Sequence, residues 1–255
     1  MLFSQIVYGP IHSRRLGVSL GMNLMPVNHK LCTFNCIYCE CGFNQPAHYP
    51  IIPTIDQVHT ALEQKLVCLR EEGVTPDVIT FSGNGEPTLH PKFAAIIRDT
   101  CALRDRYCPS AKVSVLSNST QLGRAEVVDA LLLCDHRILK LDSAIDCTMR
   151  LIDQPVNTGL TVNRIVGWLS QFEGDFTLQT CFLRGEYQSR VIDNTTPKEL
   201  DAWYRVVRQL RPKQLMIYVI DRATPVEGLQ KISREEMEHI AAPLVAEGFQ
   251  VVISA

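Results

Sequence analysis

Three cysteines near the N-terminus have the types and spacing of metal ligands. Cys32, Cys36 and Cys39 follow a C-x3-C-x2-C pattern on one short segment. A [4Fe-4S] cube takes one cysteine thiolate per iron, so three thiolates hold three irons and leave the fourth open to another ligand. The spacing therefore predicts an iron-sulfur centre with a reactive corner.

Zinc is the alternative metal for this segment, because thiolates bind zinc as well as iron. Structural zinc is usually closed by four ligands in two C-x2-C pairs, and the sequence contains no second pair. Cys41 follows Cys39 by two residues, which is too short for the usual chelate turn. We therefore favour a cluster over zinc or a coincidental spacing, with Cys41 as a bystander.

Composition favours an ordinary globular protein. The chain has 255 residues, 46% of them hydrophobic and 20% charged, and a net charge of −2, which gives no global field for nucleic acid. No segment approaches the roughly 18 to 20 unbroken apolar residues that a bilayer needs, which excludes a membrane-spanning protein. Residues 1–5 lack the features of a secretory signal, so a cytoplasmic location is expected.

Short apolar runs alternate with segments of helical period, which is the pattern of βαβ units. Several runs are apolar on both faces, as strands of a helix-covered parallel sheet are. The sequence predicts one α/β domain over residues 1–255. It would be a partial (β/α)6 TIM-like barrel with its core at about 17–220 and a C-terminal helix-strand extension over 221–255, or else an open doubly wound sheet. The predicted strands span 17–24, 77–82, 112–117, 137–141, 175–183, 213–220 and 249–253.

Capping signals mark the starts of helices between and after these strands. Thr54 precedes a segment of helical period, and the segments 196–199 and 233–236 each read as a capping box. In both candidate folds, ligands bind on the loops that follow the strands. The cysteine segment is such a loop, because it lies between the first predicted strand and the helix after Thr54.

A second strand-end loop follows the predicted strand at 77–82 and reads Gly83-Asn84-Gly85-Glu86. The two glycines let the backbone approach a ligand closely. Glu86 places a carboxylate where it can bind an amine. A glycine turn closed by Pro87 is the structural alternative.

The cysteine loop, with Tyr38 before its last cysteine, and the Gly83–Glu86 loop together resemble the radical SAM superfamily. Members of that family use a [4Fe-4S] cluster whose open iron binds the amino and carboxylate groups of S-adenosylmethionine (SAM). Reductive cleavage of SAM then yields methionine and a 5′-deoxyadenosyl radical. The resemblance implies that the three cysteines ligate the cluster, and that Gly83 to Glu86 hold the methionyl amine although the usual Gly-Gly-Glu reads Gly-Asn-Gly-Glu here.

The resemblance continues at later strand ends with lower specificity. Ser119 stands where the family pattern has glycine. Asp142 could instead cap the following helix, which is its structural alternative. Gln179 and Tyr218 are weaker candidates. The SAM-contacting residues implied by the resemblance are Tyr38, Gly83, Asn84, Gly85, Glu86, Ser117, Asn118, Asp142 and Ser143.

Three segments resemble the subgroup that includes the wyosine-forming tRNA enzymes, which condense pyruvate with a methylated guanine of tRNA. They are 9–17, with Arg14 and Arg15, and the segments 85–91 and 221–225. Two features depart from that subgroup. No cysteine precedes Cys32 for a second cluster, and the chain is slightly acidic, although Arg205, Arg208, Arg211 and Lys213 form a local basic run.

The sequence thus predicts a radical SAM enzyme that cleaves SAM at a [4Fe-4S] cluster and takes hydrogen from an unidentified small or macromolecular substrate. Its catalytic residues are not assigned. An external electron donor of the flavodoxin or ferredoxin type is implied, and tRNA is a possible partner. The alternatives are a wyosine-type tRNA-modifying enzyme, a glycyl-radical activating enzyme, or a non-catalytic electron-transfer or zinc module.

Overall fold

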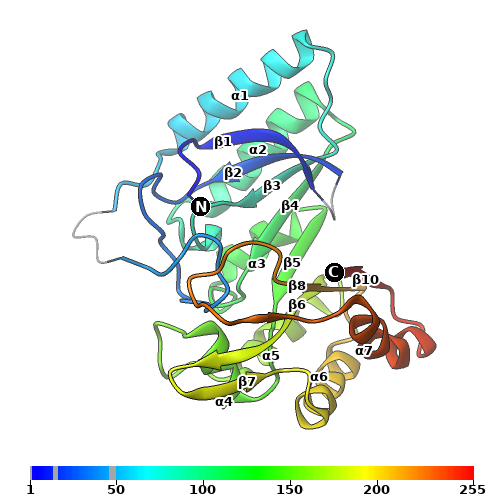
Figure 1. The fold of residues 1–255 in the computed structure, drawn as a ribbon. Coiled ribbons are helices and arrows are strands. Elements are labelled where there is room, and N and C mark those ends of the chain that lie inside the picture. The colour runs from blue at the N-terminus through cyan, green and yellow to red at the C-terminus, as the bar shows by residue number, and fades with distance from the viewer. Residues whose placement is uncertain (1, 14–16, 46–49) are drawn as a thin grey trace. The chain divides into compact units, whose positions relative to one another are not determined.

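The computed structural model describes residues 2–13, 17–45 and 50–255, and its ribbon is drawn in Figure 1. The chain divides into two compact units. The first unit comprises residues 1–32, 44–117 and 121–137, and the second comprises 33–43, 118–120 and 138–255. The single domain expected over residues 1–255 stays a prediction.

The first unit contains a sheet in the order β1-β2-β3-β4. β1 (Val7–Ser13) pairs antiparallel with β2 (Gly17–Asn23), whereas β2, β3 (Val78–Ser82) and β4 (Lys112–Ser117) are parallel. α1 packs against α2, and α2 packs against α3. The helices of this unit are α1 (Ile55–Glu71), the 3-10 turn η1 (Pro87–Leu89), α2 (Phe93–Tyr107) and α3 (Ala125–Leu132).

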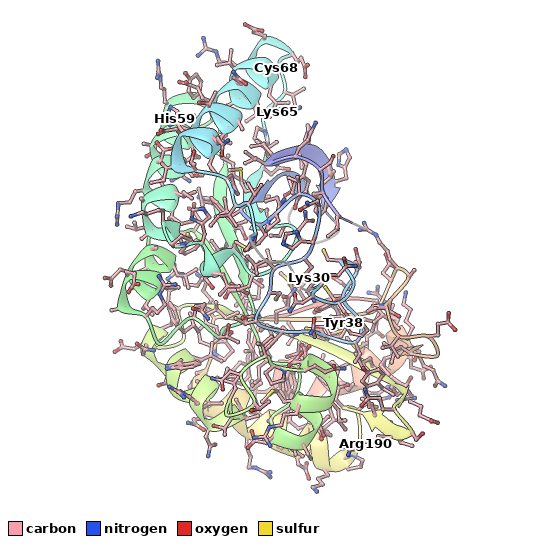
Figure 2. The ribbon with its side chains drawn as sticks, turned by 90° about the vertical axis from the view of Figure 1, so that its left-hand side faces the viewer. Lys30, Tyr38, His59, Lys65, Cys68 and Arg190 are labelled. Carbon is pink, nitrogen blue, oxygen red and sulfur yellow. The ribbon has the colours of Figure 1, made fainter. Side chains whose placement is uncertain are left out.

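The helical period predicted for α1 is confirmed. Thr54 caps the helix in a capping box with Gln57, and the buried face carries Val58, Leu62, Leu66 and Leu69. His59, Lys65 and Cys68 lie outside this buried stripe and are labelled along the helix in Figure 2; His59 contacts Asp99 of α2. This amphipathic helix buries its apolar stripe and leaves its polar stripe exposed.

The second unit contains parallel strands in the order β5-β6-β8-β10. They are β5 (His136–Lys140), whose residues 138–140 belong to this unit, β6 (Thr177–Tyr187), β8 (Gln214–Val219) and β10 (Val251–Ser254). β7 (Arg190–Asp193) and β9 (Gln230–Lys231) pair antiparallel with the end of β6. The helices are α4 (Asp146–Asp153), α5 (Val162–Leu169), the 3-10 turn η2 (Ser170–Phe172), α6 (Pro197–Leu210) and α7 (Arg234–Ala246).

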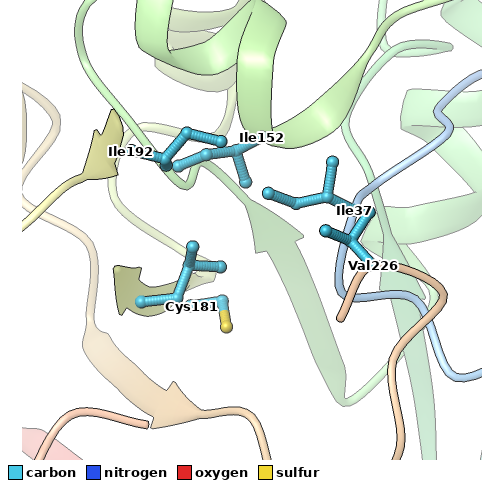
Figure 3. Packing of buried hydrophobic residues seen from close by; sticks show 6 residues of the cluster. Ile37, Ile152, Cys181, Ile192 and Val226 are labelled. Carbon is cyan, nitrogen blue, oxygen red and sulfur yellow. The ribbon is translucent and has the colours of Figure 1, made fainter. Parts of the chain in front are cut away.

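An apolar cluster in the second unit anchors the cysteine loop. Ile37 lies between Cys36 and Tyr38 in the sequence and is fully buried in this cluster, whose side chains are drawn in Figure 3. A buried isoleucine contributes about 2 kcal/mol relative to an exposed one, so the loop is held by packing as well as by hydrogen bonds. The cluster consists of Ile37, Ile152, Cys181, Leu183, Ile192 and Val226.

All seven predicted strands are present as β2, β3, β4, β5, β6, β8 and β10, with ends that differ by a few residues. Three more strands, β1, β7 and β9, were not predicted. The register of β1 shifts between Tyr8 and Ile11, around Gly9-Pro10, which removes the period-two pattern. β9 has only two residues, too few for any periodic signal.

Of the capping box predicted at Thr196 and Glu199, only the hydrogen bond to the Thr196 side chain is present. Thr196 caps α6 by accepting from the Glu199 N–H, but the Glu199 side chain accepts from Ser143 and Thr148 instead of reaching back. The box at Ser233 and Glu236 is confirmed. Arg14 and Arg15 lie outside the described residues. Among the helices in the described part of the chain, none is both long and apolar enough to cross a membrane.

Gly85 lies in close contact with the residue that precedes the first cysteine. Leu31 and Gly85 form an isolated parallel bridge. Gly85 has a φ of +152°, and a Cβ placed on it would lie 1.8 Å from the Leu31 carbonyl oxygen. Only glycine fits this position, because both the dihedral angle and the space exclude a side chain.

Gly85→Ala is expected to destabilise the protein by about 2 to 4 kcal/mol, since it adds backbone strain and a clash with backbone atoms. Gly73→Ala is the matched control, because Gly73 also has a positive φ, +69°, but its added Cβ meets nothing within 4 Å. Urea denaturation of both variants measures the difference. Equal losses of stability would contradict the predicted clash.

Candidate cofactor site

The loop after β3 is built around Asn84, whose side chain is fully buried. Its amide group donates to the carbonyls of Phe3 and Pro26 and accepts from the Phe3 N–H, each at 2.8 Å. The Asn84 N–H donates to Asn23 at the end of β2, at 3.0 Å. These bonds tie the loop to its own unit, so the Asn84 side chain is a structural support.

Glu86 is 2% exposed, and its carboxylate is oriented by three donors. Its Oε1 accepts from the Thr88 N–H at 3.1 Å, the Thr88 hydroxyl at 2.5 Å and the Ser117 hydroxyl at 2.9 Å. Ser117 is the last residue of β4. The structure thus brings two predicted site residues, Glu86 and Ser117, into direct contact at neighbouring strand ends.

The first cysteine is joined to this loop through the backbone. The Leu31 N–H donates to the Asn84 carbonyl at 2.9 Å, and the Glu86 N–H donates to the Leu31 carbonyl at 3.1 Å. The Asn44 side chain accepts from the Cys32 N–H at 3.1 Å and donates to the Cys32 carbonyl at 2.8 Å. The backbone of Cys32 is therefore fixed on both sides.

His90 closes the same loop in its neutral form. The Lys92 N–H donates to Nδ1 at 3.1 Å, so the ring proton lies on Nε2, which donates to the Pro53 carbonyl at 2.8 Å. Burial lowers the pKa of His90, and the hydrogen bond to Pro53 opposes this only in part. Charging this ring at low pH therefore works against folding.

In the second unit, the segment after Cys32 runs beside the end of α4. The Asn35 and Ile37 N–H groups donate to the Asp153 and Ile152 carbonyls, both at 2.9 Å. The Cys39 N–H donates to the Cys36 carbonyl at 3.1 Å, which forms a turn between these two cysteines. Backbone hydrogen bonds therefore define the shape of the cysteine loop.

Lys140, the last residue of β5, is the charged centre of this part of the site. Its ammonium lies 2.9 Å from the Cys36 sulfur, 2.5 Å from Asp153 Oδ1 and 3.0 Å from Asp142 Oδ2. Burial alone would lower the pKa of Lys140, but the carboxylates of Asp142 and Asp153 outweigh it and raise the pKa well above its ordinary value. Lys140 is therefore a permanent cation next to a cysteine sulfur.

Tyr38 and Asp142, both predicted site residues, are hydrogen-bonded to each other. The Tyr38 hydroxyl donates to Asp142 Oδ2 at 2.5 Å, and the Tyr218 hydroxyl donates to the Tyr38 oxygen at 3.2 Å. Burial, followed by the charge of Asp142, raises the pKa of Tyr38 well above its ordinary value. The phenol of Tyr38 therefore stays protonated and acts as a donor.

The structural alternative for Asp142, a helix cap, is wrong. α4 has Ile145 as its N-cap residue, and Asp142 Oδ1 accepts from the Cys181 N–H on β6 at 2.9 Å. Burial raises the pKa of the Cys181 thiol well above its ordinary value, with Asp142 as the next cause. Cys181 is therefore a protonated thiol in the apolar cluster.

Two further predicted residues support the backbone around this centre. The Asn118 side chain donates to the Thr33 hydroxyl at 2.8 Å and accepts from the Thr120 N–H at 3.1 Å. Ser119 has a φ of +68°, a left-handed backbone conformation that glycine adopts more readily than serine. The buried Ser143 hydroxyl donates to Glu199 at 2.7 Å, so it supports α6.

The cysteine donor set fits a cube. Its three cysteines supply soft thiolate donors, which a cube takes one per iron. In the described ranges, no three His, Cys, Asp or Glu side chains lie close enough together to hold a single metal ion. All ten cysteines are described, and none is in a disulfide. The Lys140 ammonium donates to the sulfur of Cys36, the second cysteine of the set.

Comparison with family models gave no match. Among curated proteins, the chain is 30% identical over 237 residues to "GTPase Obg" of Brachyspira hyodysenteriae, covering 91% of this chain but 32% of that protein. It is 28% identical to a "UPF0026 protein" of Helicobacter pylori, covering 91% of this chain and 71% of the relative. It is also 28% identical to "UPF0026 protein slr1464" of Synechocystis, covering 93% and 82%.

The GTPase name of the first relative does not carry over to this chain. A GTPase phosphate loop requires Gly-Lys followed by Ser or Thr, and no lysine in this sequence follows a glycine. The chain spans 32% of that relative's length. The likeness is therefore to a part of that protein, and the activity in its name is not assigned to this chain.

Solved structures decide the fold. A radical SAM methyltransferase from Sphaerobacter thermophilus has a TM-score of 0.68 at 14% identity, over 92% of this chain and 65% of the other. Streptococcus suis SuiB bound to SAM has a TM-score of 0.65 at 12% identity, over 92% and 50%. The chain has the radical SAM fold. The predicted α/β class and partial barrel are confirmed at this level.

Two residues of this candidate site, Lys140 and Asp153, were not predicted from the sequence. Lys140 did leave a signal, because a lysine within the apolar run Leu139-Lys140-Leu141 needs a buried counter-ion. Asp153 left none, since a carboxylate in the last turn of a short helix is ordinary on a solvated face. Its pairing follows only from the packing of α4.

Stability is expected to fall as the pH drops below about 6.5, the ordinary pKa of histidine, partly because of His90. Its folded pKa is lowered, so the unfolded state binds the proton more readily, and the stabilising contribution present above that pH is lost on acidification. Denaturant midpoints between pH 5 and 8 measure this loss. His90→Gln, which keeps a donor for Pro53 but does not titrate, should show a shallower pH dependence; an equal slope would refute the assignment.

Proposed function

We propose that this chain is a radical SAM enzyme whose [4Fe-4S] cluster is held by Cys32, Cys36 and Cys39. The observation that carries the proposal is the position of this cysteine loop, which follows the first parallel strand of a chain with the radical SAM fold. The fold by itself does not establish an activity. The cysteine spacing, the shaped loop and the fold agree with one another, which supports the assignment.

The side chains around the cluster have distinct proposed roles. The carboxylate of Glu86, oriented by Thr88 and Ser117, would bind the methionyl amine of SAM. The aromatic ring of Tyr38, held by Asp142, would pack near the adenine. A cluster held by the three cysteines would supply the electron for reductive cleavage of SAM to methionine and a 5′-deoxyadenosyl radical. The protein's own contribution is to place and shield these groups.

The proposal includes a reductant and a location. An external donor of the flavodoxin or ferredoxin type would reduce the cluster, because the single cysteine loop provides no second cluster. A cytoplasmic location is proposed, since ten cysteines without a disulfide suit a reducing compartment. The substrate class stays open between small and macromolecular molecules. SuiB has also been solved with a precursor peptide bound.

Modification of a tRNA base is the second candidate. The structure of TYW1 with a lysine-pyruvate adduct bound matches at a TM-score of 0.62 and 13% identity, over 89% of this chain and 73% of the other. The wyosine-like segments favour this candidate as well. The local basic run offers less charge than its sequence suggests, because Arg208 pairs with Glu247 and Lys213 with Asp175.

Anaerobic reconstitution is expected to load about four irons and four sulfides per chain. Reduction with dithionite in the presence of SAM should then release 5′-deoxyadenosine, measured by chromatography. Cys36→Ala should lose both the cluster and this release. Cys41→Ser is the matched control and should keep both, because Cys41 lies outside the three-cysteine pattern.

A wild-type sample loaded with the cluster but unable to release 5′-deoxyadenosine would refute the enzymatic proposal. One zinc per chain in a colourless protein would refute the cluster. Loss of iron in Cys41→Ser equal to that in Cys36→Ala would show that Cys41 is a ligand.

The tRNA candidate predicts direct binding of bulk tRNA, with an affinity that weakens between about 50 and 200 mM salt because phosphate contacts release counterions. Filter binding with the cluster-loaded protein measures this affinity. A double-stranded DNA of equal length is the control for non-specific charge. If no tRNA is retained at the low salt concentration, this candidate is excluded and small molecules or peptides become the substrates to test.

A further inference from the structure

The contact between Lys140 and Cys36 suggests a role for a residue outside the three-cysteine pattern. The lysine ammonium donates to the cysteine sulfur at 2.9 Å, and both residues are buried in the second unit. A lysine at the end of a buried strand could have paired with carboxylates alone. Here it also makes a charged hydrogen bond to a predicted cluster ligand.

Two carboxylates and two aromatic rings hold the ammonium at this position. Asp153 from α4 accepts at 2.5 Å, and Asp142 lies 3.0 Å away. The ammonium lies 5.1 Å from the ring centre of Phe34 and 4.9 Å from that of Tyr38. With partners on several sides, the lysine has little freedom to leave the sulfur.

Hydrogen bonds to cluster sulfurs tune the reduction potential of iron-sulfur centres. A donor withdraws electron density from the thiolate, and a fixed positive charge stabilises the additional electron of the reduced cluster. Both effects make reduction easier.

We propose that Lys140 is a positioning residue that raises the reduction potential of the cluster through its charged N–H···S bond to Cys36. Asp142 and Asp153 hold the lysine in place for this bond. This inference rests on the proposed function, because it requires a cluster on Cys36. It explains how a buried charged group next to the loop would help an external donor deliver its electron.

The experiment compares cluster-loaded wild type with two variants by redox titration monitored with electron paramagnetic resonance. The double variant Lys140→Met/Asp153→Asn removes the ammonium together with one counter-ion, which avoids leaving both carboxylates unpaired. Its midpoint potential should become more negative by at least about 59 mV. For one electron, this shift corresponds to a tenfold change in the equilibrium constant of reduction. Asp153→Asn alone keeps the ammonium and should not lower the potential.

Iron content and thermal unfolding of each loaded variant provide the controls for folding. A double variant that carries the cluster at an unchanged potential would overturn the role of Lys140 and leave the proposed function standing. A fall in potential of the same size in Asp153→Asn would also overturn it. Failure of the wild type to take up a cube would instead refute the proposed function. If the double variant does not fold, Lys140→Gln should show the same lowered potential.

Discussion

The buried ammonium of Lys140 is the constraint on which the second unit's part of the site depends. A buried cation is tolerated only when anions and hydrogen-bond acceptors surround it. The acceptors here come from three separate segments, the residues just after β5, α4 and the cysteine loop, so satisfying this charge requires all three to adopt their places together. Tyr38, Tyr218 and Cys181 are then arranged around Asp142, the second carboxylate of the group.

The first unit has a different constraint: the backbone N–H and carbonyl groups around the tight loop after β3 need hydrogen-bond partners. Gly83 and Gly85 both have positive φ angles; Asn23 lies against Gly83, and Leu31, just before Cys32, lies against Gly85. Asn84 satisfies neighbouring backbone groups, while Glu86 is left to accept three donors through one oxygen. A negatively charged group is thus fixed beside the end of β4 with little rotational freedom.

Much of this arrangement could be predicted from sequence, because its signals are local. The cysteine spacing, the glycines of the loop after β3 and the ends of β4 are short-range features, and β4 spans the predicted residues 112–117. β1 was missed because its irregular register hides the period of a strand. The pairing of Lys140 with Asp153 was missed because it joins a strand to a helix through packing alone, and no spacing rule links such residues. The SAM contacts themselves stay predictions.

The bonds between Asn84 and Phe3 couple the loop to the start of the described chain. Phe3 also stacks on Tyr8 of β1, with ring centres 3.7 Å apart. Detaching residues near Phe3 would leave a buried amide with unmet donors and acceptors, at a cost of about 1 to 3 kcal/mol per group. Local unfolding of the N-terminal segment and disorder of the loop should therefore be one cooperative event, visible as matched amide exchange rates at Phe3 and Asn84.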